Sequence, residues 1–175
     1  MNNIQYLFDY TPYFHGGAND RLSRIMLSFK RGHESAFQFF LSLMVNFFDL
    51  SEYDSSKTVV CCVPSHDGSL YNPLQRLCSS IAADCGFIDG THLIRKLYPT
   101  ESFCRSGIRD SRQLKESIEI DGALKGLRVV LLDDVTTTGI SFAVITGLLI
   151  EAGAGSVDCI ALGQTVKLSE RRAAV

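Results

Sequence analysis

The chain contains the stretch Val129-Val130-Leu131-Leu132-Asp133-Asp134-Val135-Thr136-Thr137-Thr138-Gly139-Ile140-Ser141, in which an apolar run meets two acids, three threonines and a glycine. The apolar run is rich in valine, which predicts a buried strand of a parallel sheet. Asp133 and Asp134 follow at the carboxyl end of that strand, where open α/β sheets bind their ligands. A helix is expected next, with Ser141 as the residue that caps it. Its apolar side chains recur at helical spacing, at Phe142, Val144, Ile145, Leu148 and Leu149.

The loop from Thr136 to Gly139 has the chemistry of a phosphate site. Hydroxyl groups and the free N–H groups of a helix N-terminus donate hydrogen bonds to an anion, and the helix dipole favours negative charge there. The preceding carboxylates suit sugar hydroxyls or Mg²⁺, which prefers oxygen ligands. The pattern therefore predicts a site for a phosphorylated sugar with a divalent metal. A buried strand with a polar turn and no ligand is the plainer alternative, but adjacent acids are costly where they serve nothing.

The composition indicates one globular domain, residues 1–175. The apolar fraction is 46% and the charged fraction 21%, both ordinary for a single domain of this length. The net charge of −2 argues against nucleic-acid binding driven by bulk charge. The sequence contains no GxxxxGK[ST] motif, so a nucleoside triphosphatase loop is not expected.

The cysteines and the N-terminus indicate a cytoplasmic protein. None of the six cysteines forms a CxxC pair, and no histidine cluster accompanies them, so we expect reduced thiols and no zinc site. No basic region precedes an apolar stretch at the N-terminus, and no run of eighteen apolar residues exists. Neither a signal peptide nor a membrane span is therefore expected.

Alternation of strands and helices predicts an α/β fold with a parallel sheet of four or five strands and helices on both faces. Besides the central strand, the predicted elements are helices at 20–30, 34–48 and 73–85 and strands at 58–63, 91–94 and 156–162. The two helices ahead of the first strand would form a small N-terminal cover within residues 1–50. The aromatic segment 1–19 either covers a flat ligand or, as we expect, pins the N-terminus to the core.

Two further segments and a basic pair are candidates for the same crevice. The loop Ser65-His66-Asp67-Gly68 follows the strand at 58–63 and is either a ligand loop or a plain strand-to-helix turn. The basic segment 95–120 is either a loop that closes over a diphosphate or, from Arg109 to Glu119, a solvated helix. Lys30 and Arg31 either face an anion or complement the dipole of the helix that they end.

These residues resemble the phosphoribosyl-diphosphate (PRPP) motif of the type I phosphoribosyltransferases: an apolar strand, Asp-Asp, an apolar residue and Thr-Thr-Thr-Gly. The resemblance spans a core of about residues 58–163. It implies transfer of ribose 5-phosphate from PRPP to a nucleobase or another nitrogen nucleophile, with Mg²⁺ neutralising the diphosphate that leaves. It also implies that Asp133 and Asp134 are catalytic residues that hold the ribose hydroxyls and help to place the metal. The implied 5′-phosphate site comprises Val135, Thr136, Thr137, Thr138, Gly139 and Ser141.

The implied diphosphate site draws on the other two loops. Its members are Ser65, His66, Asp67, Gly68, Arg105 and Arg109, with Arg112 and Gln113 as further counterparts of family residues. An acid beside an anion is unusual, so Asp67 is expected to face the metal or solvent. The steps Val63-Pro64 and Phe29-Lys30-Arg31-Gly32 resemble the competence protein F-like branch of the family.

One position departs from the pattern of the purine-using members. They often carry an acid where this chain has Thr137, and a threonine cannot act as a general base at neutral pH. The base is therefore unidentified, and three functions stay open. The first is a phosphoribosyltransferase, the second a non-catalytic regulatory module that binds PRPP or a nucleotide, and the third a competence-type DNA-processing accessory protein. A homodimer is expected by family analogy alone.

Overall fold

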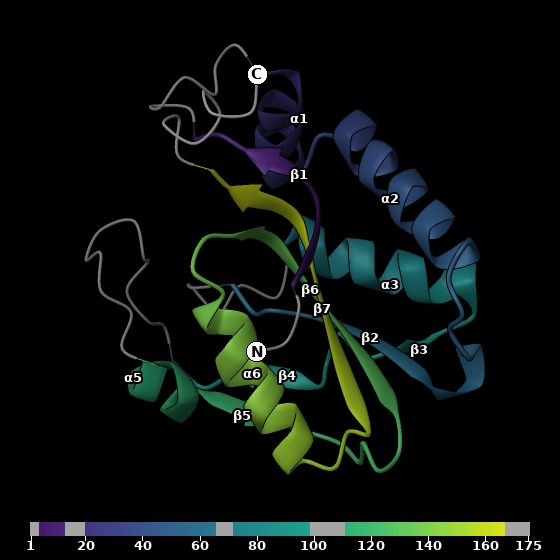
Figure 1. Ribbon diagram of the computed structural model, residues 1–175, viewed down its shortest axis with the longest axis vertical. Coiled ribbons are helices and arrows are strands. Elements are labelled where there is room, and N and C mark those ends of the chain that lie inside the picture. Colours follow the sequence, from purple (N-terminus) through teal and green to yellow (C-terminus); the bar gives the residue numbers. More distant parts are fainter. Residues whose placement is uncertain (1–3, 13–19, 66–71, 99–110, 167–175) are drawn as a thin grey trace.

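The computed structural model describes residues 4–12, 20–65, 72–98 and 111–166 (Figure 1). Its elements are β1 Gln5–Tyr10, α1 Arg21–Lys30, α2 Glu34–Asp49, the 3₁₀ helix η3 Ser55–Lys57, β2 Thr58–Cys62, α3 Pro73–Cys85, β3 Ile88–Asp89, β4 Ile94–Lys96, α5 Ser111–Glu116, β5 Ile118–Ile120, β6 Arg128–Thr136, α6 Ile140–Glu151 and β7 Ser156–Thr165. In the described part of the chain, no helix is both long and apolar enough to cross a membrane.

Five strands form one parallel sheet in the order β1-β7-β6-β2-β3. The central strand β6 pairs with β2 on one side and β7 on the other. Val129, for example, lies opposite both Val59 and Val157. The prediction of a parallel α/β sheet is therefore confirmed, and β6 is the strand that the sequence pattern placed at its centre.

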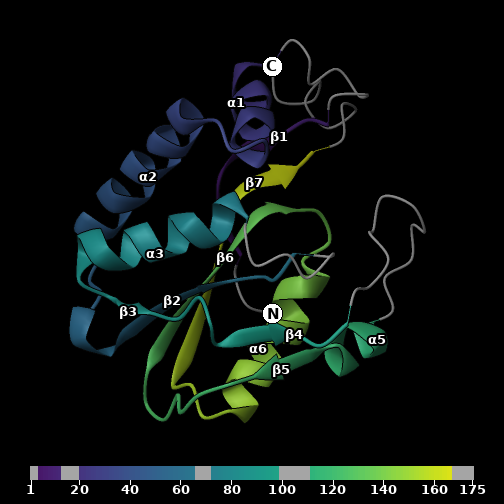
Figure 2. The same cartoon turned by 180° about the vertical axis from the view of Figure 1, so that it is seen from behind.

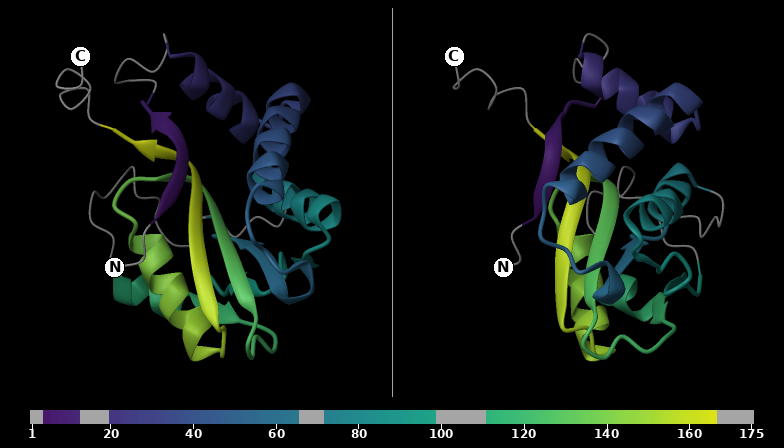
Figure 3. Two further views of the ribbon diagram at one scale, coloured as in Figure 1. Left: turned by 45° about the vertical axis from the view of Figure 1, so that its right-hand side comes forward. Right: turned by 90° about the vertical axis from the view of Figure 1, so that its right-hand side faces the viewer.

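Different helices cover the two faces of this sheet (Figure 3, left). Along β6, Val130 and Leu132 pack in a cluster with side chains of α1, α2 and α3. Val129 and Leu131 pack in a second cluster with side chains of α6, α5, β4 and β5. All four β6 side chains are fully buried. Because the strand is apolar on both sides, helices must cover both faces, as predicted.

The N-terminal segment contributes a strand that the sequence analysis did not predict. Residues Gln5–Tyr10 lie parallel to β7, with Gln5 opposite Ile160 and Tyr10 opposite Thr165. This is possible because β7 runs to Thr165, beyond the predicted end at residue 162, so its outer edge offers backbone groups for pairing. For the described part of the segment, the expectation that it packs on the core is correct, since Phe8 belongs to the core cluster and Leu7 and Tyr10 pack against it. The described helices before β2 are α1, α2 and the short η3.

The strand predicted at 91–94 is wrong in position. The strand β3 ends at Asp89, whose Oδ1 atom accepts a hydrogen bond from the Thr91 N–H at 2.9 Å and stabilises a turn. Gly90 permits the close approach, since a β-carbon there would lie 2.5 Å from Cγ1 of Val59. The chain then enters β4, which pairs antiparallel with β5 in a separate two-stranded sheet.

Candidate functional site

A cavity of about 410 Å³ lies at the carboxyl ends of β2 and β6. It is lined by residues 133–141 of β6 and the following turn, by residues 63–65 after β2, and by the start of α3 and the end of α1. Figure 2 shows the turn from β6 to α6 near the amino end of α3. The position agrees with the rule that ligands of open α/β sheets bind beyond the carboxyl ends of the strands.

Asp133 and Asp134 lie half-buried at the end of β6. Successive side chains of a strand point to opposite faces, so Asp134 lies on the side of α1 and Asp133 on the side of α6. The Asp134 N–H donates a hydrogen bond of 2.8 Å to Oδ1 of Asp133. The Asp134 Oδ2 atom forms an ion pair of 3.1 Å with Nζ of Lys30, the last residue of α1.

Lys30, one of the two basic residues that the sequence analysis proposed for this crevice, lines the cavity. Partial desolvation lowers the pKa of its ammonium, but Asp134, together with Tyr10 and Asp133, more than offsets that effect, so the net pKa lies above the ordinary value. The side chain therefore stays charged at neutral pH. Lys30 lies in the last turn of α1, as the dipole interpretation predicted, and its ion-pair partner is a carboxylate of the site. Whether it faces an anionic ligand stays a prediction.

The loop after β6 presents three threonines and a glycine to the cavity. Thr136 ends the strand and is buried, whereas Thr137 and Thr138 are exposed. The Oγ1 atoms of Thr137 and Thr165 form a hydrogen bond of 3.0 Å, which joins the loop to the end of β7.

Gly139, rather than Ser141, is the N-cap of α6. It has a φ of 73°, in the left-handed region that favours glycine, and provides no side-chain cap. The helix therefore begins at Ile140, and Ser141 lies buried inside its first turn, so the predicted cap is wrong. Gly139, Ile140 and Ser141, at the N-terminus of this helix, line the cavity, and the positive end of the helix dipole lies there. The geometry suits an anion.

The remaining predicted site residues divide into two groups. Ser65 lines the cavity. His66, Asp67, Gly68, Arg105 and Arg109 lie outside the described residues. Arg112 and Gln113 lie exposed on α5, and neither is among the residues that line the cavity.

Asn72 is a cavity residue that the sequence analysis missed. Its Oδ1 atom accepts a hydrogen bond of 2.7 Å from the Gln75 N–H, which makes Asn72 the N-cap of α3. Pro73 follows at the first helical position. The step Asn-Pro before an apolar helix is a recognisable start signal, and it was available in the sequence.

The carboxylates fit a metal that enters with a phosphate ligand. Within the described ranges, no group of three or more His, Cys, Asp or Glu side chains is arranged to hold a metal ion. Asp133 and Asp134 offer oxygen atoms at the cavity. Mg²⁺ is usually bound by one or two carboxylates together with substrate phosphates rather than by a protein cage, so two acids beside an anion site suffice.

No protein-family model matches the chain, and no curated protein sequence matches it. Among solved structures, it is similar to the adenine phosphoribosyltransferase of Leishmania tarentolae, with 14% identity over 91% of both chains and a TM-score of 0.51. It is also similar to the phosphoribosylpyrophosphate synthetase of Mycobacterium smegmatis, with 20% identity over 70% of this chain and 33% of that one (TM-score 0.44). A hypoxanthine phosphoribosyltransferase of Staphylococcus aureus is also similar, with 12% identity over 82% of this chain and 64% of that one (TM-score 0.40).

These likenesses concern the fold. The chain spans about a third of the synthetase and less than two thirds of the hypoxanthine enzyme. The adenine enzyme is matched over nearly its whole length. The five-stranded parallel sheet with its helices is therefore the α/β fold of type I phosphoribosyltransferases.

Proposed function

We propose that the protein is a Mg²⁺-dependent phosphoribosyltransferase, which transfers ribose 5-phosphate from PRPP to a nucleobase or another nitrogen nucleophile and releases diphosphate. One observation carries the proposal. Two carboxylates, a Thr-Thr-Thr-Gly segment and the N-terminus of α6 line a single cavity at the carboxyl end of β6. The fold that the chain shares with an adenine phosphoribosyltransferase supports it.

Each part of the cavity has a role in this reaction. The N–H and hydroxyl groups of residues 136–141 bind the 5′-phosphate, and Asp133 and Asp134 accept hydrogen bonds from the ribose hydroxyls. Ser65 and the residues after it hold the diphosphate. In the transfer, the bond from C1 to the diphosphate oxygen breaks and a bond from C1 to nitrogen forms. Asp133 and Asp134 would hold Mg²⁺, which would neutralise charge on the diphosphate. The protein itself mainly orients the two reactants.

The acceptor must be one whose proton does not have to be taken by a carboxylate at position 137. Thr137 is exposed, and its hydroxyl is hydrogen-bonded to Thr165. A threonine hydroxyl does not accept a proton at neutral pH. The proposal therefore disfavours a hypoxanthine-type acceptor. Membership of the competence protein F-like branch and a homodimeric state remain predictions from the sequence.

A regulatory module that binds PRPP without catalysis is the second candidate. The threonine at position 137 favours it, since the Thr137 hydroxyl cannot take a proton from an acceptor at neutral pH. In that case the ligand would bind but no diphosphate would be released.

Calorimetric titration of PRPP, with and without Mg²⁺, tests the proposal, followed by an assay of diphosphate release with a panel of bases. Asp133→Asn and Asp134→Asn should abolish Mg²⁺-dependent binding. Asp84→Asn is the matched control, because Asp84 is an exposed acid in the last turn of α3 and does not line the cavity.

The outcomes separate the three functions. Mg²⁺-dependent binding with diphosphate release supports the transferase. Binding without release for any base supports the regulatory module. If the wild-type protein binds no PRPP under either condition, both proposals are wrong, and an accessory role with a protein or DNA partner becomes the leading hypothesis.

A further inference from the structure

The cavity joins two parts of the protein that are far apart in sequence. Lys30 ends α1, in the N-terminal helical layer, and Asp134 lies at the end of the central strand β6. Their ion pair, at 3.1 Å, is a direct polar contact between that layer and the proposed ligand site. A side chain of the cover thus occupies a position at which a ligand or metal would act.

The charges of the cavity show what this contact does. Among the described residues that line it, Lys30 is the sole cation, and Asp133 and Asp134 are the sole anions. Lys30 therefore offsets the negative charge of Asp134. Any cation that approaches Asp134 must displace the ammonium or lie close to it, and like charges that share one carboxylate repel each other.

The ion pair is built so that it can be exchanged. The two side chains are 37% and 31% exposed, and ion pairs with this much exposure are weak because water screens them. Lysine also has a flexible four-carbon stem and three rotatable donors, so its ammonium can change partner.

The backbone that carries Lys30 is held in place. Met26 and Phe29 of α1 are buried in the core. At the other end of the helix, the Ser23 hydroxyl accepts a hydrogen bond of 3.0 Å from the Thr11 N–H, just after β1. Only the lysine side chain, and not the helix, has to move when a ligand arrives.

From these observations we propose that Lys30 is a resident counter-ion of Asp134, which weakens metal binding in the ligand-free protein and transfers to the phosphates of the ligand when the ligand binds. The proposal rests on the proposed function and adds to it how metal binding and ligand binding are coupled. The metal and the phosphate ligand bind as a pair, because the ligand supplies the anion that draws Lys30 away from Asp134. Lys30 is thus a positioning residue that couples the two binding events.

The test compares Mn²⁺ binding, followed by electron paramagnetic resonance, in the wild-type protein and in Lys30→Met. Mn²⁺ alone should bind the variant about two- to fivefold more tightly, the size expected for one partly exposed charge pair. With Mn²⁺ held constant, PRPP should bind the variant more weakly by a similar factor. Lys30→Arg keeps the charge and should resemble the wild type in both measurements.

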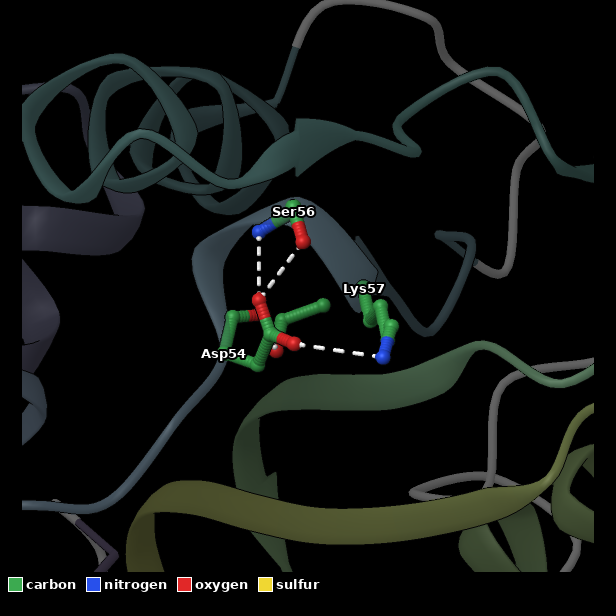
Figure 4. Close-up of polar contacts among 4 residues, drawn as sticks. Asp54, Ser56 and Lys57 are labelled. Carbon is green, nitrogen blue, oxygen red and sulfur yellow. Dashed lines mark hydrogen bonds and ion pairs between the residues drawn. The ribbon is translucent and has the colours of Figure 1, made fainter.

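Lys57→Met is the matched control. Lys57 forms an ion pair of 3.6 Å with Asp54, whose carboxylate also accepts hydrogen bonds from Ser56 (Figure 4). This pair precedes β2, at the end of the strand opposite the cavity. The control loses the same charge from the same type of pair, so its affinities for Mn²⁺ and for PRPP should both stay at the wild-type value.

Two results overturn the inference. One is equal Mn²⁺ affinity in the wild type, Lys30→Met and Lys57→Met, including the case in which none of them binds Mn²⁺ measurably. The other is tighter Mn²⁺ binding by Lys30→Met with no loss of PRPP affinity. Because the first arm contains no PRPP, failure of this inference is distinct from failure of the proposed function, which would appear as a wild-type protein that binds no PRPP.

Discussion

Ile4 lies directly against Gly139, so that a β-carbon added to Gly139 would come within 2.7 Å of the Ile4 Cδ1 atom. The contact joins the residue before β1 to the turn between β6 and α6. Gly139 also has a φ of 73°, which L side chains adopt only with strain. The glycine of the proposed phosphate loop is therefore required mainly by its own backbone, and it also lets a residue from the N-terminus pack closely against the turn.

Gly139→Ala should destabilise the protein by about 1 to 2 kcal/mol, mainly because alanine is strained in the left-handed region. The Ile4 atom is the end of a flexible side chain and can move aside. The double variant Ile4→Ala with Gly139→Ala should therefore recover little of the loss. Urea unfolding at equilibrium measures both values.

Gly147→Ala is the control, because Gly147 lies inside α6 with open space around its α-carbon. Alanine has the higher helix propensity, so this variant should gain about 0.5 to 1 kcal/mol. Equal changes in the free energy of unfolding at the two glycines would contradict backbone strain at Gly139. Full recovery in the double variant would show that the contact with Ile4 dominates.

Local signals explain which elements the sequence predicted well. The helix α3 has its predicted bounds, since Asn72 and Pro73 start it and Gly86, with a φ of 69°, ends it. The central strand was predicted because four apolar residues in a row require burial on both faces. In each case the deciding residues are neighbours in the sequence.

Contacts between distant segments explain what the sequence did not predict. The strand β1 exists because it pairs with β7, and no local pattern gives that register. Lys30 reaches Asp134 only because α1 packs against the sheet. The cap of α6 was placed at Ser141 because serine is a common cap, whereas the backbone turn at Gly139 starts the helix earlier.

Arg128→Lys should destabilise the protein by about 1 kcal/mol, because lysine cannot replace a stacked and hydrogen-bonded guanidinium. Arg128 donates a hydrogen bond of 2.6 Å to Asp158, and its guanidinium carbon lies 4.0 Å from the centre of the Tyr53 ring. Arg112→Lys is the control, since Arg112 is 86% exposed and pairs with Glu116 on its own helix. Urea unfolding should give a smaller loss for the control; equal losses would contradict the role of the Tyr53 contact.

Arg76→Met should return the pKa of Glu34 towards its ordinary value of 4.5. Hydrogen bonds from Arg76 and then Gln38 lower that pKa to about 2, and carbon NMR of the Glu34 carboxyl group measures the change. Since the folded-state pKa is the lower one, the pair contributes stability above pH 4.5 and loses it as the pH falls towards 2. Both side chains are more than half exposed, so the contribution is small. A Glu34 pKa that stays near 2 in Arg76→Met would assign the shift to Gln38.

Thr137→Val should weaken Mg²⁺-dependent PRPP binding by about two- to tenfold, the range for one lost hydrogen bond, if the Thr137 hydroxyl contacts the 5′-phosphate. The alternative cause is loss of the hydrogen bond of 3.0 Å to Thr165. Thr165→Val removes that same bond but keeps the loop hydroxyl. Calorimetry should therefore give a near-normal affinity for Thr165→Val and a reduced one for Thr137→Val. Equal losses in the two variants would mean that the threonine pair only positions the loop, and the direct phosphate contact of Thr137 would be ruled out.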